Sequence, residues 1–136
     1  MGDERKTVVL TGASRGIGHA TVMRFSREGW RIITCSRDDV PAECQRDPNW
    51  ANHITADLAD PRGVEAMVAE ANDFLGEGAL DALVNNAAVS PKTPFKERLG
   101  CLNGDIQDWR LVFELNFFAP LALARGFAAP LRKGRG

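Results

Sequence analysis

The 136-residue sequence contains no tyrosine, so no phenolic hydroxyl within these residues can act as an acid or a base. Cysteine is scarce and odd in number. Cys35, Cys44 and Cys101 form no C-x-x-C pair, which argues against a disulfide framework and a structural zinc site. We therefore expect reduced thiols, with Cys35 buried in a strand. The two histidines, His19 and His53, have no second ligand at helical or hairpin spacing, so no metal site is expected.

Neither sign of charge dominates, because 17 Lys and Arg residues face 18 Asp and Glu residues, for a net charge of -1. This balance provides no long-range attraction to nucleic acid or to an anionic membrane. The N-terminal residues MGDERKT lack the apolar segment of a secretory signal. The most apolar stretch, residues 111–130, is interrupted by Glu114, Asn116, Pro120 and Arg125, which argues against a membrane span. The sequence therefore predicts a cytoplasmic protein with neither nucleic acid nor membrane as partner.

What the sequence does contain is a regular alternation of strand and helix patterns within a length that suits one domain. Strands are predicted at residues 6–11, 31–36, 52–57 and 79–86, and helices at 16–29, 61–76 and 105–124. This order predicts a doubly wound, Rossmann-like α/β fold with a parallel sheet in the strand order 3-2-1-4. Residues 37–50 are expected to be a loop with one helical turn, 90–105 a long loop and 132–135 a solvated tail.

The predicted helices carry more specific expectations. The face of the first helix expected to pack on the sheet comprises Ile17, Ala20, Thr21 and Phe25. His19 is expected on the exposed side of that helix. In the second helix, Asp60 is the expected N-cap, Pro61 is expected in the first turn and Gly76 after the end. The apolar stripe of the second helix comprises Val64, Met67, Val68, Ala71 and Leu75. A bend is expected in the third helix at Pro120.

The segment TGASRGIG, residues 11–18, lies between a predicted strand and a predicted helix. Such a loop places unpaired backbone N–H groups at the positive end of the helix dipole, which suits phosphate. Gly12 permits the tight turn, Gly16 lets a ligand approach the backbone, Gly18 lets helix and strand pack closely, and Ser14 adds a hydroxyl. The spacing matches neither GxGxxG nor a Walker loop. The loop alone therefore leaves phosphate binding and a ligand-free turn equally open.

Further landmarks decide between these alternatives. TGxxxGxG occurs together with Asp57-Leu58 after the third strand, NNAA at residues 85–88 and Asn116 in the last helix. This set resembles the short-chain dehydrogenase/reductase family over Thr7 to Gly136. The resemblance implies that the adenosine ribose and pyrophosphate are surrounded by Gly12, Ser14, Arg15, Gly16, Ile17 and Gly18. It also implies that Asp57 and the backbone of Leu58 contact adenine, and that Asn85 and Ala87 line the cofactor. Ala88 stands where the family usually has glycine.

The end of the second strand indicates which dinucleotide is preferred. An acidic residue about 20 positions beyond the glycine loop selects the free ribose of NAD. Ser36 occupies this place and Arg37 follows it, so a 2′-phosphate meets no repulsion and gains a charged donor. NADP is therefore favoured over NAD, with Arg15 as a second positive charge. The alternative is that Asp38 and Asp39 bind the ribose, if the strand ends two residues later.

The resemblance implies hydride transfer between a nicotinamide ring and a carbonyl or alcohol, assisted by a serine, a tyrosine, a lysine four residues later and an asparagine. Only the asparagine is assigned here, as Asn116; the other three are expected beyond Gly136. Residues 1–136 are thus expected to be an incomplete dinucleotide-binding domain, truncated after the helix that follows strand 4. Three hypotheses follow: the first half of an oxidoreductase, a non-catalytic nucleotide-binding or subunit module, or an inactive remnant. In the last two, Asn116 is a buried polar residue that bonds to nearby backbone.

The predicted architecture leaves apolar surface uncovered. The fourth strand is an open edge. The last helix carries more apolar residues than one face can bury on so small a sheet, namely Trp109, Val112, Phe113, Phe117, Phe118 and Leu121. We therefore expect a homo-oligomer, or a partner that completes the fold.

Overall fold

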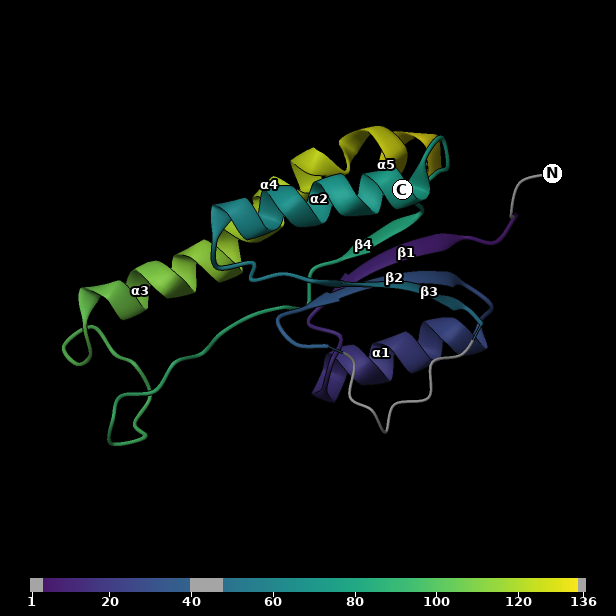
Figure 1. Cartoon of the computed structure of the whole chain (residues 1–136). Helices are drawn as coiled ribbons and strands as arrows, with labels where there is room; N and C mark the ends of the chain where they lie inside the picture. The colour runs from purple at the N-terminus through teal and green to yellow at the C-terminus, as the bar shows by residue number, and fades with distance from the viewer. Residues whose placement is uncertain (1–3, 40–47, 135–136) are drawn as a thin grey trace.

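The computed structural model describes residues 4–39 and 48–134 and contains a parallel four-stranded sheet (Figure 1). The strands are β1 (Thr7–Thr11), β2 (Arg31–Ser36), β3 (Trp50–Thr55) and β4 (Ala82–Val84). Their order is β3-β2-β1-β4, with every pair parallel. The predicted parallel α/β architecture and strand order are confirmed. Cys44 and the helical turn expected within residues 37–50 fall mainly on residues outside the described ranges.

Helices cover both faces of this sheet (Figure 1). Helix α1 (Gly16–Arg27) lies on one face, and α2 (Pro61–Leu75), α4 (Ala119–Gly126) and α5 (Ala128–Gly134) lie on the other. Side chains alternate along β1, so that Val8 and Leu10 face the α1 layer while Val9 faces α2 and α4. The sheet is therefore buried on both sides, which explains the nearly continuous apolar character of its central strands.

Strand β4 is shorter than its predicted span of 79–86. At its start, the Asp81 side chain accepts the Thr7 N–H at 2.8 Å, and the Asp81 N–H donates to the Thr7 carbonyl at 2.9 Å. Beyond its end, the N–H groups of Asn86 and Ala87 both donate to the Thr11 hydroxyl, at 3.1 and 3.0 Å. The Asp81 carboxylate and the Thr11 hydroxyl thus accept N–H groups in place of backbone carbonyls at the two ends of the strand. The ladder between β1 and β4 therefore contains three residue pairs.

The predicted sheet-facing side of α1 is correct only in part: Phe25 packs against the core and Thr21 is partly buried, but the residues nearer the start of the helix are exposed. Ile17 is 79% exposed, and Ala20 is exposed as well, whereas Gly18, Val22 and Ser26 are buried. The ring of His19, which was expected on the exposed side, is half-buried with its centroid 6.5 Å from that of Trp50. The reason is the close packing of Gly18 on the end of β1, which turns the helix so that the line through residues 18, 22 and 26 faces the sheet.

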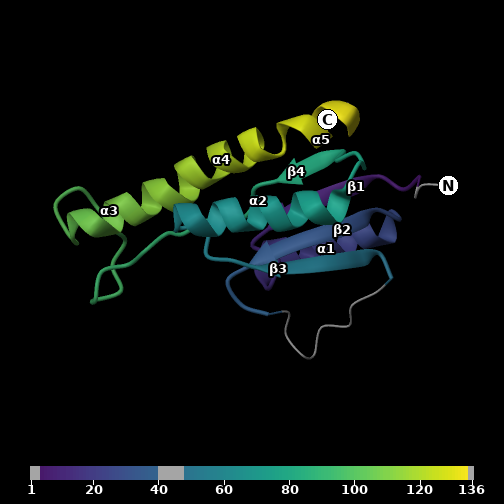
Figure 2. The ribbon, with the colours of Figure 1, turned by 45° about the horizontal axis from the view of Figure 1, so that its top comes forward.

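Helix α2 agrees with its predicted stripe, since Val64, Met67, Ala71 and Leu75 are buried and Val68 is partly buried. The segment after the long loop differs from its prediction. It consists of α3 (Ile106–Phe113), a π-helical turn η1 (Glu114–Phe118), then α4 and α5. Arg132 and Lys133 belong to α5 rather than to a solvated tail. Figure 2 shows α3, η1 and α4 as one long rod whose α3 end projects beyond the sheet.

The bend in this rod does not lie at Pro120. The chain bends by 63° between Gly126 and Ala128, and Pro120 sits in the first turn of α4. Within η1, the Ala119 N–H donates to the Glu114 carbonyl, five residues back. This wider turn leaves room for the Pro120 ring, which in a regular helix would clash with the carbonyl four residues earlier.

Apolar side chains on this rod form an uncovered surface, which we call the outer face. Its members are Phe113, Phe117, Phe118 and Leu121, which are between 49% and 56% exposed. In the described part of the chain, no single helix has the length and apolar content needed to cross a membrane. Among the described residues, the segments Ile106–Gly126 and Ala128–Gly134 meet the length and composition criteria only when they are counted as one, and the chain is bent between them.

Candidate functional site

A cleft of about 870 Å³ opens at the carboxyl ends of the strands. The segments that follow β1, β2, β3 and β4 all contribute to its walls. This is the edge at which open parallel α/β sheets bind ligands. All the predicted cofactor contacts except Asn85 line it: Gly12, Ser14, Arg15, Gly16, Ile17, Gly18, Ser36, Arg37, Asp57, Leu58 and Ala87.

The glycine loop is built around a close approach of α1 to the end of β1. Gly12 has φ +68°, and its N–H donates to the Cys35 carbonyl at 2.8 Å. A Cβ atom on Gly18 would overlap the Gly12 carbonyl oxygen and lie 2.6 Å from the Asn86 amide nitrogen. The same amide donates to the Gly12 carbonyl at 3.1 Å. Gly12, Gly18 and Asn86 therefore form one packed unit with no space for an additional carbon.

The first turn of α1 is open toward the cleft. Gly16 has φ +56°, and a Cβ atom built there would have no atom within 4 Å. Arg15, the N-cap residue, makes no side-chain capping hydrogen bond within the described chain. The first N–H groups of a helix have no intrahelical partners and carry partial positive charge. The residues present therefore fit a phosphate group, which would supply the missing acceptors.

The side of the cleft that follows β4 differs from the prediction by one residue. Asn86, rather than Asn85, lines the cleft, and Asn85 is exposed outside it. Three bonds hold Asn86 and Ala87: two N–H groups on the Thr11 hydroxyl and the Asn86 amide on the Gly12 carbonyl. Thr11 is 1% exposed, and sequence reasoning missed its role. The signal was present as a hydroxyl residue at the last position of the strand, but its partners lie 75 and 76 residues away.

The amide of Asn116 is occupied by backbone. Its Nδ2 donates to the Val89 carbonyl at 2.8 Å, and its Oδ1 accepts from the Val89 N–H at 2.8 Å. Asn116 lies in η1 and is exposed rather than buried. The pair of bonds ties the π-helical turn to the loop after β4. Leu111 and Leu115 of the same rod contribute the adjoining apolar wall of the cleft.

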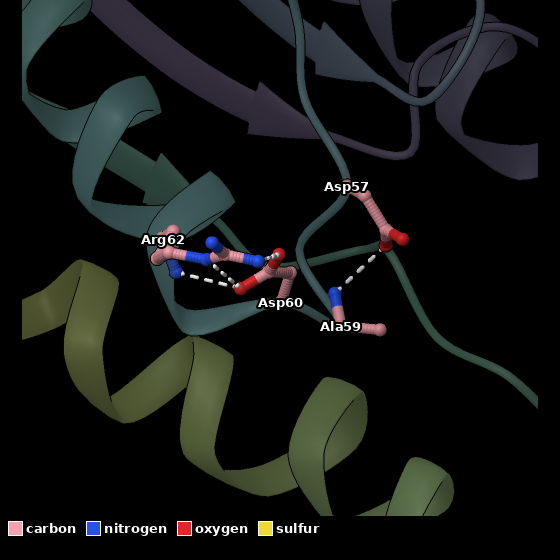
Figure 3. Close-up of polar contacts among 4 residues, drawn as sticks. All are labelled: Asp57, Ala59, Asp60 and Arg62. Atoms are coloured by element: carbon pink, nitrogen blue, oxygen red, sulfur yellow. Dashed lines mark hydrogen bonds and ion pairs between the residues drawn. The ribbon is translucent and has the colours of Figure 1, made fainter.

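The loop between β3 and α2 holds two carboxylates in local turns (Figure 3). The Asp57 carboxylate accepts from the Ala59 N–H at 3.0 Å. The Asp60 carboxylate accepts from the Arg62 N–H at 2.9 Å, which confirms the predicted N-cap of α2. A Cβ atom on Gly63 would overlap the Asp57 carbonyl oxygen, so α2 also packs closely on this loop. Asp57 is thereby held at the cleft by a turn and by the helix that follows.

The hydrogen bond from the Arg62 backbone, helped by the Arg62 guanidinium, lowers the pKa of Asp60 below 3.8. The carboxylate is the form that caps α2, so its contribution to stability is complete above the unfolded pKa and disappears as pH falls through the folded pKa. We expect Asp60→Ala to lower the Tm at neutral pH. Asp60→Asn should keep most of the stability that the cap contributes, because asparagine also caps helices. Thermal unfolding between pH 7 and pH 2.5 checks this. A wild-type and Asp60→Ala difference that persists undiminished in strong acid would contradict it.

The end of β2 is the segment on which the two alternatives for ribose recognition depend. The strand ends at Ser36, and its hydroxyl donates to the Asp38 carbonyl at 2.5 Å. Arg37 and Asp38 are exposed and line the cleft. Asp39 is absent from the lining, and its carboxylate accepts from the Thr55 hydroxyl at 3.0 Å. The strand does not continue to the point at which both Asp38 and Asp39 would face a ribose.

Cys35 is fully buried beneath the same edge, as predicted. Burial raises the pKa of its thiol to about 12, against a smaller lowering by a hydrogen bond from the Ala56 backbone. The thiol is therefore protonated at neutral pH, and in these apolar surroundings Cys35 is not a nucleophile. Across residues 4–39 and 48–134, no group of three or more His, Cys, Asp or Glu side chains is placed to hold a metal ion.

Comparison with known proteins identifies similar chains. The family model for short chain dehydrogenases matches residues 6–136. Protein FixR of Bradyrhizobium diazoefficiens is 45% identical over 134 residues, which are 98% of this chain and 48% of FixR. A short chain dehydrogenase/reductase family oxidoreductase from Brucella ovis, solved in complex with a partially ordered NAD, is 48% identical with a TM-score of 0.89. The match covers 98% of this chain and 60% of that one. NADPH-bound carbonyl reductase from chicken fatty liver is 25% identical with a TM-score of 0.76, over 95% of this chain and 52% of that one.

The chain spans about half the length of the curated relatives it matches. Within that span the family model matches residues 6–136 of the 136. This protein therefore belongs to the short chain dehydrogenase family.

Proposed function

We propose that residues 1–136 form the dinucleotide-binding part of an oxidoreductase that transfers hydride between NADP and a carbonyl or alcohol substrate. The observation that carries this proposal is the uncapped first turn of α1, which opens into the cleft at Gly16 where no atom lies within 4 Å of an added Cβ. Family membership supports it, because short chain dehydrogenases bind nicotinamide dinucleotides.

The cleft residues divide into three groups by position. The loop of Gly12, Ser14, Arg15, Gly16, Ile17 and Gly18 would hold the pyrophosphate and adenosine ribose through backbone N–H groups and the Ser14 hydroxyl. Asp57, already fixed by its turn, would accept from the adenine amino group, with the backbone of Leu58 beside it. Ala87 would line the path toward nicotinamide together with Asn86; contact with Asn85 stays a prediction.

The preference for NADP rests on the end of β2. Ser36 is neutral and its hydroxyl is engaged by the Asp38 carbonyl, so a 2′-phosphate would meet no carboxylate at that position. Arg37 follows at the cleft wall and would supply a charge-assisted grip. The Brucella ovis relative was solved with NAD and the chicken carbonyl reductase with NADPH, so both dinucleotides belong in the test.

When bound, the dinucleotide supplies the hydride acceptor or donor. The residues of this chain bind and orient it: the glycine loop holds phosphates, and the Asn116 pair with Val89 fixes the loop that borders the cleft. A second candidate is a nucleotide-binding module without turnover. An assay of hydride transfer on the protein that binds dinucleotide separates the two.

Two further expectations belong to this proposal. The outer face and the open edge of β4 are where a second copy, or the remainder of the fold, would pack. A groove of about 340 Å³ between α2 and the η1–α4 segment adjoins this face. A cytoplasmic location stays a prediction from the sequence.

Isothermal titration of the purified protein with NADPH and NADH tests the proposal. We expect saturable binding of both at one site per chain, with NADPH bound about tenfold or more tightly, as one additional charge-assisted contact predicts. Inorganic phosphate at the same concentration serves as the control for nonspecific anion binding. Heat signals indistinguishable from buffer for both dinucleotides would overturn the proposal.

A further inference from the structure

His53 remains without an assignment, although it lies next to the dinucleotide cleft. It occupies β3, paired with Thr34 of β2 in the sheet register. Its ring is half-buried, with its centroid 6.3 Å from the indole of Trp50 in an edge-on arrangement. Both of its ring nitrogens have partners, and these lie on opposite sides of the ring: one in the sheet and one in the turn that follows β2.

The partners on both sides of the ring together indicate the tautomer, because the Asp38 carbonyl at Nε2 can only accept. His53 Nδ1 lies 2.7 Å from the Thr34 hydroxyl, which is fully buried. That hydroxyl already accepts the Trp50 indole N–H at 2.7 Å. Its own proton is therefore available for Nδ1, with the Asn52 carbonyl at 3.4 Å as the weaker alternative. In the neutral ring, Nδ1 is then the acceptor and Nε2 carries the proton.

The turn side of the ring uses that proton. His53 Nε2 lies 3.0 Å from the Asp38 carbonyl and 3.2 Å from the Ser36 hydroxyl. The Ser36 hydroxyl donates to the same carbonyl at 2.5 Å. The Asp38 carbonyl is thereby held by two donors, one from its own turn and one from the neighbouring strand. Arg37 lies between these two anchored residues, so they set the position of its backbone.

We propose that His53 is a positioning and specificity-determining residue, which holds the Ser36–Asp38 turn from β3 so that Arg37 is presented to the 2′-phosphate of NADP. This inference rests on the proposed dinucleotide function. The polar chain from Trp50 through Thr34 and His53 to Asp38 links the core under α1 to the cleft wall. Rotation of the ring would break both bonds at once, so packing against Trp50 and bonding to the turn reinforce each other.

The test measures the ratio of the NADH to the NADPH dissociation constant in His53 variants of the full-length protein. His53→Leu fills similar space without a donor, and we expect it to lower the ratio about threefold to tenfold, mainly through weaker NADPH binding. His53→Gln retains an amide donor for the Asp38 carbonyl and is expected to restore most of the preference. Long-range nitrogen–proton NMR spectra of the wild type should show the proton on Nε2.

Ile54→Val is the matched control, because Ile54 is a neighbouring β3 residue that is 1% exposed and belongs to the core on the α2 side. It should lower stability without changing the ratio. If His53→Leu does not fold, Thr34→Val removes the Nδ1 partner with nearly unchanged shape and should shift the ratio in the same direction.

Equal ratios in the wild type, His53→Leu and Thr34→Val would overturn the inference while leaving dinucleotide binding intact. A wild type that binds neither dinucleotide would instead overturn the proposed function, and the inference with it.

Discussion

Gly18→Ala is expected to lower the Tm by on the order of 5–10 °C and to weaken dinucleotide binding at least tenfold. The added Cβ would overlap the Gly12 carbonyl oxygen, a backbone atom, and press on the Asn86 amide, which is hydrogen-bonded to that same oxygen. Overpacking of this kind costs about 1–3 kcal/mol, which is a shift of several degrees in a domain of this size. Helix α1 must move away from β1, and its first N–H groups then leave the phosphate position. Thermal unfolding and NADPH titration measure both effects.

Gly100→Ala provides the matched control for this change. The nearest atoms to its added Cβ would belong to the Asn103 side chain, at 3.5 Å or more, and its φ is not in the left-handed region. The same loss of backbone freedom in the unfolded chain therefore occurs without a clash in the fold. We expect its Tm and NADPH affinity to stay close to wild type. Equal losses in Gly18→Ala and Gly100→Ala would show that close packing of α1 on β1 does not build the phosphate site.

Arg37→Ala is expected to weaken NADPH binding by about 10- to 100-fold while leaving NADH binding within about twofold of wild type. A hydrogen bond between charged groups contributes about 1.5–3 kcal/mol, and each 1.4 kcal/mol corresponds to a factor of ten. Only NADPH carries the 2′-phosphate that the guanidinium would bind. Titration at two salt concentrations checks the electrostatic origin, because the difference between wild type and variant should shrink as salt rises.

Arg27→Ala is the control for the loss of one positive charge. Arg27 is exposed in the last turn of α1, at the end of the helix away from the cleft. It should change neither affinity measurably. If Arg37→Ala weakens NADH and NADPH equally, the residue contributes general positive potential or local structure, and the preference for NADP must have another origin.

Both of these predictions begin from patterns that are local in the sequence. The end of β2 could be predicted from the sequence because polar residues follow its apolar pair Ile32 and Ile33, and the structure ends the strand at Ser36. The role of Arg37 at the ribose stays a prediction. Gly18 could be assigned to close packing because glycine at a strand–helix junction has few other uses. The overlap partner, the Gly12 carbonyl, lies six residues away in the same loop. Local pattern is sufficient for both.

Asn86 and His53 show where local pattern stops. Two adjacent asparagines follow β4, and the sequence cannot indicate which of them faces the cleft. The choice depends on the Thr11 hydroxyl and the Gly12 carbonyl, more than seventy residues earlier. His53 looked like an isolated histidine because its partners, Thr34 and Asp38, belong to another strand and its turn. The register between β2 and β3 brings these groups together. Residue spacing within a single strand does not reveal that register.

The sequence by itself determined the elements whose free energy is local. The apolar strands, the Asp60 cap, the stripe of α2 and the glycine loop depend on neighbours within about one helical turn, so composition and periodicity contain them. Tertiary structure alone decided which side of α1 faces the sheet, where the C-terminal rod bends, which asparagine lines the cleft and what holds the turn after β2. Each of these depends on contacts between segments distant in sequence, whose relative placement is set by packing of the whole sheet and its helices.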